Sequence, residues 1–118
     1  MFEKNLNITL LLDFYGDILS SRQFEMLDMY YNEDFSLAEI AEKYNISRQG
    51  VRSVLKKGET ILTEMEDKLK LALRFTNLLE KSSEIANKLD EITKNINDND
   101  ISSKITSIID EIKEMAEY

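Results

Sequence analysis

The chain has 118 residues, enough for one small domain with an extension, and a net charge of −8 at pH 7. It contains no Cys and no His, which excludes disulfides, thiolate chemistry, the usual zinc sites and catalysis by imidazole. No apolar run approaches the roughly 18 residues that a membrane span needs, and the first residues lack the features of a signal peptide. We therefore expect a cytoplasmic protein.

The apolar residues recur at helical spacing, and the chain has no Pro and only three Gly. This pattern predicts an all-α fold, because strands would need a sustained period of two. The first helix is expected over about residues 6–18. Its predicted apolar stripe consists of Leu10, Leu11, Phe14, Tyr15 and Ile18.

The second helix is expected to begin at Ser20. Gln23 stands three residues later and completes a capping box, while Leu19 and Phe24 have the spacing of a hydrophobic staple. Five residues should make this helix strongly apolar: Phe24, Leu27, Met29, Tyr30 and Tyr31. The polar residues 32–34 should end it.

Residues 35–55 predict two short helices joined by a tight turn. Ser36 and Glu39 form a capping box for the first of them, and Ser47 caps the second. Asn45 lies in the turn and tolerates the left-handed conformation that such a turn needs. The apolar positions suit a helix-turn-helix unit: Ile40, Ala41, Ile46, Val51 and Val54.

The second helix of this unit has a polar, basic outer face, as a recognition helix does. The candidate nucleic-acid-binding residues are Arg48, Gln49, Arg52, Ser53, Lys56 and Lys57. Residues 47–58 carry four basic groups and no acid. Two alternatives stay open: an ordinary helical hairpin with a solvated basic face, or pairing of the arginines with Glu39 or Glu42 of the preceding helix.

Beyond residue 55 apolar residues follow a seven-residue rhythm, which needs a partner helix within the chain or in a second subunit. The rhythm slips around residues 76–83, so we expect a break or bend there. Residues 95–100 form a polar hinge before a last amphipathic helix. We predict a helix-turn-helix domain over residues 1–62 and a helical dimerisation arm over residues 63–118, which joins a homodimer.

No Gly-rich phosphate loop, metal-ligand spacing or identifiable carboxylate pair occurs in the sequence. We therefore expect neither an enzyme nor a cofactor.

Three segments resemble region 4 of bacterial sigma factors, which reads the promoter −35 element: residues 19–27 (LSSRQFEML), 37–42 (LAEIAE) and 46–52 (ISRQGVR). With residues 13–15 (DFY) and the acidic helical tail, nearly the whole chain is similar to the YlxM family of helix-turn-helix proteins. Genes of that family lie beside those for the signal recognition particle (SRP) GTPase and its receptor. The resemblance implies a regulatory or accessory role in that pathway, with DNA or SRP RNA bound and the SRP GTPase as a further partner.

The acidic composition supports a different class of function. In this alternative the protein is an adaptor whose acidic helical arm binds a protein of the SRP pathway, and the helix-turn-helix is only a scaffold. Binding to nucleic acid that depends steeply on salt would separate the two hypotheses.

Overall fold

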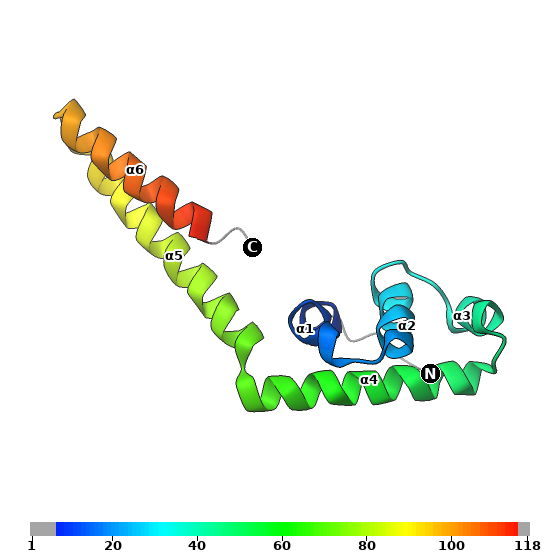
Figure 1. Ribbon diagram of the computed structural model, residues 1–118. Helices are drawn as coiled ribbons and strands as arrows, with labels where there is room; N and C mark the ends of the chain where they lie inside the picture. Colours follow the sequence, from blue (N-terminus) through cyan, green and yellow to red (C-terminus); the bar gives the residue numbers. More distant parts are fainter. Residues whose placement is uncertain (1–6, 116–118) are drawn as a thin grey trace. The chain divides into compact units, whose positions relative to one another are not determined.

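The computed structural model describes residues 7–115, and in this range the chain is all-α, as predicted (Figure 1). The elements are α1 (Asn7–Tyr15), the 3₁₀ turn η1 (Gly16–Ile18), α2 (Ser21–Tyr31), α3 (Leu37–Tyr44), α4 (Arg48–Leu69), α5 (Leu71–Lys94) and α6 (Asn99–Met115). The chain divides into two compact units, Met1–Ala72 and Leu73–Tyr118.

Helix α4 is the axis of the first unit, and α1, α2 and α3 all pack against it (Figure 1). The core contains seven side chains that are almost completely buried: Ile8, Met26, Leu27, Ile40, Val51, Leu55 and Leu62. The sequence placed the domain boundary at residue 62. Helix α4 passes through that residue without interruption, and the first unit extends to Ala72 because Ala72 is also buried in its core.

The predicted capping boxes of α2 and α3 are both present. The Ser20 hydroxyl accepts a hydrogen bond from the Gln23 N–H at 3.2 Å, and the Gln23 side chain accepts one from the Ser20 N–H at 3.0 Å. Ser36 and Glu39 exchange the same two bonds at 3.0 Å each. Local sequence therefore fixes where both helices begin.

The stripe predicted for the first helix is right for Leu11, Phe14 and Tyr15 and wrong for Leu10 and Ile18. The buried residues of α1 are Ile8, Leu11, Leu12 and Tyr15, which follow the i, i+3, i+4, i+7 pattern of one helix face. Leu10 and Ile18 are 38% and 52% exposed. Leu6, the predicted first residue, lies outside the described residues.

Phe24, one of the apolar residues of α2, is 38% exposed. Its ring lies against Gly16, where an added Cβ would come within 2.8 Å of the ring. Phe24 therefore covers the end of α1 from outside.

The break predicted at residues 76–83 is also wrong, because α5 is continuous from Leu71 to Lys94. The chain breaks instead at Lys70, which adopts a left-handed conformation with φ 55°. The Tyr15 hydroxyl accepts a hydrogen bond from the Leu71 N–H at 3.1 Å, and Glu66 accepts one from the Ala72 N–H at 3.0 Å. These side chains satisfy the first backbone donors of α5, so packing rather than local sequence sets the break.

Three tyrosines join the helices of the first unit by donating hydrogen bonds to glutamates. These bonds run from Tyr15 in α1 to Glu66 in α4, from Tyr31 in α2 to Glu59 in α4, and from Tyr44 in α3 to Glu25 in α2. Each helix that packs around α4 is thus tied to a neighbour by a directional polar bond as well as by apolar contact.

The second unit contains α6 and the rest of α5, which run antiparallel as a hairpin (Figure 1). The polar hinge predicted between them is present after Lys94, and α6 begins at Asn99. Ala86 and Ile109 are its most buried side chains, at 4% and 7% exposed. No helix in the described part of the chain is both long enough and apolar enough to cross a membrane.

The left-handed turn gives a first prediction. Asn45 has φ 53° and ψ 48°, as expected from the sequence. Asn45→Val should lower the free energy of unfolding by about 1–2 kcal/mol, because a β-branched residue is disfavoured in this region. Urea unfolding followed by circular dichroism measures the change. Asn45→Gly is the matched control and should retain the stability; an equal loss in both variants would contradict the backbone explanation.

A second prediction concerns alkaline pH. Burial, followed by the hydrogen bond to Glu25, raises the pKa of Tyr44 from 10.0 to about 12. Because the folded state holds this proton more tightly than the unfolded chain, the stability from this linkage is present below pH 10 and is lost between pH 10 and 12. As the pH rises from 10 to 12, the urea concentration at the midpoint of unfolding should fall less steeply for Tyr44→Phe than for the parent. Equal slopes would contradict the assignment.

Candidate nucleic-acid interface

The turn of residues 45–47 sets the direction in which α4 leaves the helix-turn-helix unit. The Ser47 hydroxyl accepts a hydrogen bond from the Gly50 N–H at 2.9 Å, and the Ile46 N–H donates to the Ala41 carbonyl at 3.1 Å. Ala41, one of the apolar positions predicted for the helix-turn-helix unit, is buried. The first turns of α4 are therefore fixed on α3.

Helix α4 has two chemically different faces. Val51, Leu55 and Leu62 are 0% exposed and anchor it in the core. All six candidate residues are exposed: Arg48, Gln49, Arg52, Ser53, Lys56 and Lys57. The geometry of the helix thus presents the polar side chains outward while the apolar ones hold the helix in place.

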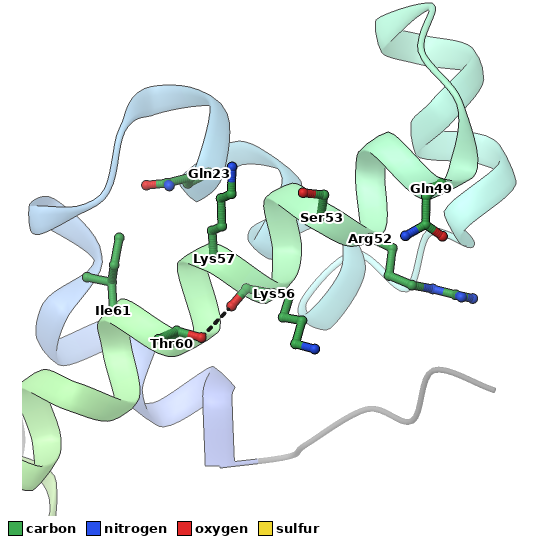
Figure 2. Close-up of a pocket in the computed structure, with 8 residues that line it drawn as sticks. All are labelled: Gln23, Gln49, Arg52, Ser53, Lys56, Lys57, Thr60 and Ile61. Carbon is green, nitrogen blue, oxygen red and sulfur yellow. Dashed lines mark hydrogen bonds between the residues drawn. The ribbon is translucent and has the colours of Figure 1, made fainter.

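Five of the six candidate residues line one open hollow of about 640 Å³ (Figure 2). The lining residues are Gln49, Arg52, Ser53, Lys56, Lys57, Thr60 and Ile61 of α4 and Gln23 of α2. Arg48 is exposed at the start of α4 but does not line the hollow. The structure therefore brings most of the predicted set together and leaves Arg48 beside it.

Sequence reasoning missed Gln23, Thr60 and Ile61. Thr60 lies four residues after Lys56, on the same helix row, and its hydroxyl donates to the Lys56 carbonyl at 2.9 Å. That spacing is the signal in the sequence that places Thr60 beside Lys56. No sequence signal indicated that Gln23, from another helix, would join the site.

Gly58 explains why Gln23 lies so close to α4. A Cβ added at Gly58 would come within 2.6 Å of Leu27 Cδ1 and 3.7 Å of Gln23 Cβ. The absence of a side chain therefore lets α2 approach α4 and form one wall of the hollow.

The charge around the hollow is positive. Glu59, the acid that follows the basic segment, is half-buried and accepts a hydrogen bond from Tyr31, away from the exposed row. Burial raises the pKa of Glu59, and the bond from Tyr31 opposes this change. Among residues 7–115 no ion pair joins Arg48 or Arg52 to Glu39 or Glu42.

The site therefore offers charge and hydrogen-bond donors on a helix. No group of acidic residues in the described range could hold a metal ion. An exposed helix with Arg, Lys, Gln and Ser side chains has the groups that contact phosphates and base edges.

Comparison with known proteins agrees with this architecture. Residues 2–112 match the model of the UPF0122 family, described as "Putative helix-turn-helix protein, YlxM / p13 like". The chain belongs to this family. The UPF0122 protein of Acetivibrio thermocellus is 43% identical over 95% of this chain and 98% of its own length. Those of Thermoanaerobacter sp. (44% identical; 91% of this chain, 88% of the relative) and Halalkalibacterium halodurans (43%; 77% and 80%) are also similar.

The close approach at Gly58 gives a third prediction. Gly58→Ala should lower the free energy of unfolding by about 1–3 kcal/mol, because the added methyl meets the fully buried Leu27. This loss should appear although Ala favours helix over Gly by about 1 kcal/mol. Urea unfolding measures it. Gly50→Ala, where an added Cβ comes no closer than 3.3 Å to its neighbours, is the control; a larger loss there would contradict the packing argument.

Proposed function

We propose that this UPF0122 protein binds nucleic acid through the outer face of α4 and acts as a non-enzymatic regulator in the SRP pathway. One observation carries the proposal: four exposed cations, Arg48, Arg52, Lys56 and Lys57, lie on one firmly packed helix without an intervening acid, and the last three line an open hollow. Because the helix backbone that carries these cations is already fixed, less conformational entropy is lost on binding.

The net charge of −8 does not exclude this role. Electrostatic interactions between exposed charges are screened beyond about 8–10 Å at ordinary salt, so a phosphate at α4 interacts mainly with the local cations. The expected affinity of one such face is modest. Two copies joined through the second unit, which begins at Leu73, would present two faces to the same nucleic acid and bind more tightly.

The nucleic acid is DNA or SRP RNA, and the SRP GTPase is the protein partner proposed with it. This part rests on the resemblance to the YlxM family and on the position of that family's genes. The helix-turn-helix geometry suits the major groove of DNA. RNA would be contacted through phosphates, unpaired bases or the 2′-hydroxyl.

The rival proposal is an acidic adaptor that binds a basic surface of an SRP-pathway protein through its arm. Helix α6 supports it, because Asp110, Glu111 and Glu114 are all exposed there. Both proposals place the protein in the same process, but only the first needs the cations of α4.

Salt titration gives a fourth prediction that separates them. Arg48→Ala and Arg52→Ala should each weaken binding to duplex DNA or SRP RNA. Each should also reduce the slope of log affinity against log salt by about one, because each variant loses one phosphate contact. Fluorescence anisotropy with a labelled probe measures the slope.

Lys94→Ala is the matched control. It removes one exposed charge of the arm, which pairs with Asp90 at 3.7 Å, and should leave the slope unchanged. Circular dichroism checks that each variant folds. If both arginine variants fold and bind the DNA and the RNA as the parent does, the α4 proposal fails and the adaptor replaces it.

A further inference from the structure

The hairpin of α5 and α6 carries more apolar residues than its own packing uses. Its inner residues are buried or half-buried: Leu79, Ser82, Ala86, Leu89 and Thr93 on α5, and Ser102, Ile105, Ile109 and Ile112 on α6. Steps of three and four separate them, as in a two-helix coiled coil. A second set is 40–59% exposed and recurs every seven residues: Leu78, Ile85 and Ile92 on α5, and Ile101, Ile108 and Met115 on α6. We call this set the outer apolar face.

Both stripes of the outer apolar face lie on the same side of the hairpin. Ser83 directly follows the inner residue Ser82, and Lys113 directly follows the inner residue Ile112. Ser83 and Lys113 line one hollow of about 330 Å³. In an antiparallel pair, residues that follow these inner positions share one side, so residues on the preceding flank share the other. Leu78, Ile85 and Ile92 each precede an inner residue of α5, and Ile101 and Ile108 do so on α6.

The two stripes are also level with each other. The same hollow sets Ile112 opposite residues 79–86 of α5. When this register is extended along the two antiparallel helices, three pairs of residues lie at the same height along the helix axes: Leu78 with Met115, Ile85 with Ile108, and Ile92 with Ile101. The outer apolar face is therefore continuous over both helices, and contiguous exposed apolar patches of this kind mark interaction sites.

The charges beside the face differ between its two edges. Arg74, Lys81 and Lys88 form a basic row beside the α5 stripe, whereas Lys104 and Glu111 flank the α6 stripe. Lys104 is paired with Asp100 at 3.3 Å, and Lys81 is paired with Glu84 of its own helix at 3.6 Å, so Arg74 and Lys88 are the cations of the row for which no ion pair is present among the described residues. The opposite side of the hairpin is polar, with Ser83 and Lys113 among its residues.

We propose that the outer apolar face binds a second copy of this chain, with the two-fold axis parallel to the helices. Helix α5 of each copy then packs on α6 of the other and closes a four-helix bundle. This inference deepens the two-copy arrangement proposed above. The seven-residue repeat on both helices fits helical partners, and the level stripes make the face self-complementary, as a two-fold interface requires.

The edge charges select this orientation. With the axis parallel to the helices, Lys81 lies level with the partner's Glu111, and Lys88 lies level with the partner's Lys104, whose charge Asp100 offsets. With the axis perpendicular to the helices, α5 would pack on α5 of the partner. The row of Arg74, Lys81 and Lys88 would then face the same row of the partner. Because the opposite side of the hairpin is polar, association stops at two copies.

Sedimentation of the full chain gives the fifth prediction. The parent should be a dimer at micromolar concentration. Ile85→Glu should raise the dimer dissociation constant roughly a hundredfold or more, because the interface would then bury an unpaired carboxylate. Ser83→Glu, which adds the same charge on the polar side of the same helix, should remain a dimer. A parent that sediments as a monomer would overturn the proposal. The same holds for a monomer whose outer apolar face binds anionic lipid vesicles instead of a second copy.

Disulfide trapping tests the orientation of the two copies. Because the chain contains no Cys, only the introduced cysteines can form a disulfide. A mixture of Ile85→Cys and Ile108→Cys chains should form a disulfide between the two variants under mild oxidation. Each variant alone should cross-link much more slowly. Faster cross-linking of Ile85→Cys with itself would overturn the parallel axis. No nucleic acid is present in either assay, so this proposal and the nucleic-acid proposal can fail separately.

Discussion

The packing of α4 is the constraint on which the first unit depends. Val51, Leu55 and Leu62 are completely buried, and burial of each such side chain contributes about 1.5–3 kcal/mol. Gly58 lies between them and lets α2 approach. Because one face of the helix is held in this way, its opposite face cannot rotate away from solvent. The same packing that stabilises the domain therefore exposes Arg52, Lys56 and Lys57.

Polar bonds add direction to this apolar packing. Tyr15, Tyr31 and Tyr44 each donate to a glutamate on another helix, so α1, α2 and α3 have fixed partners. Apolar contacts alone are tolerant of rotation and slippage, whereas a hydrogen bond to a carboxylate has a preferred length and angle. The Tyr15–Glu66 pair has a second role, because both side chains accept bonds from the first N–H groups of α5.

Two kinds of surface are separated along the chain. The first unit concentrates cations on one helix face, and the second exposes level apolar stripes with charged edges. An acidic protein with one modest basic face gains most from acting as two copies, because linked binding raises the effective concentration of the second face. The proposed roles of the two units are thus complementary, although each rests on its own residues.

The sequence by itself determined the features that depend on neighbouring residues. Caps at Ser20, Ser36 and Ser47, and the left-handed Asn45, follow from local hydrogen bonds and backbone sterics. The helical period also indicated which residues of α4 face outward, so most of the candidate site could be predicted.

Only the tertiary structure decided features that depend on residues far apart in the chain. The helix break at Lys70 has no Gly or Pro to mark it, and it is accompanied by bonds from the distant Tyr15 and Glu66. Gln23 joins the candidate site because Gly58 lets another helix approach. The exposure of Leu10 was likewise decided by which face of α1 meets the core. Such contacts have no local signal, because they arise when separate helices pack together.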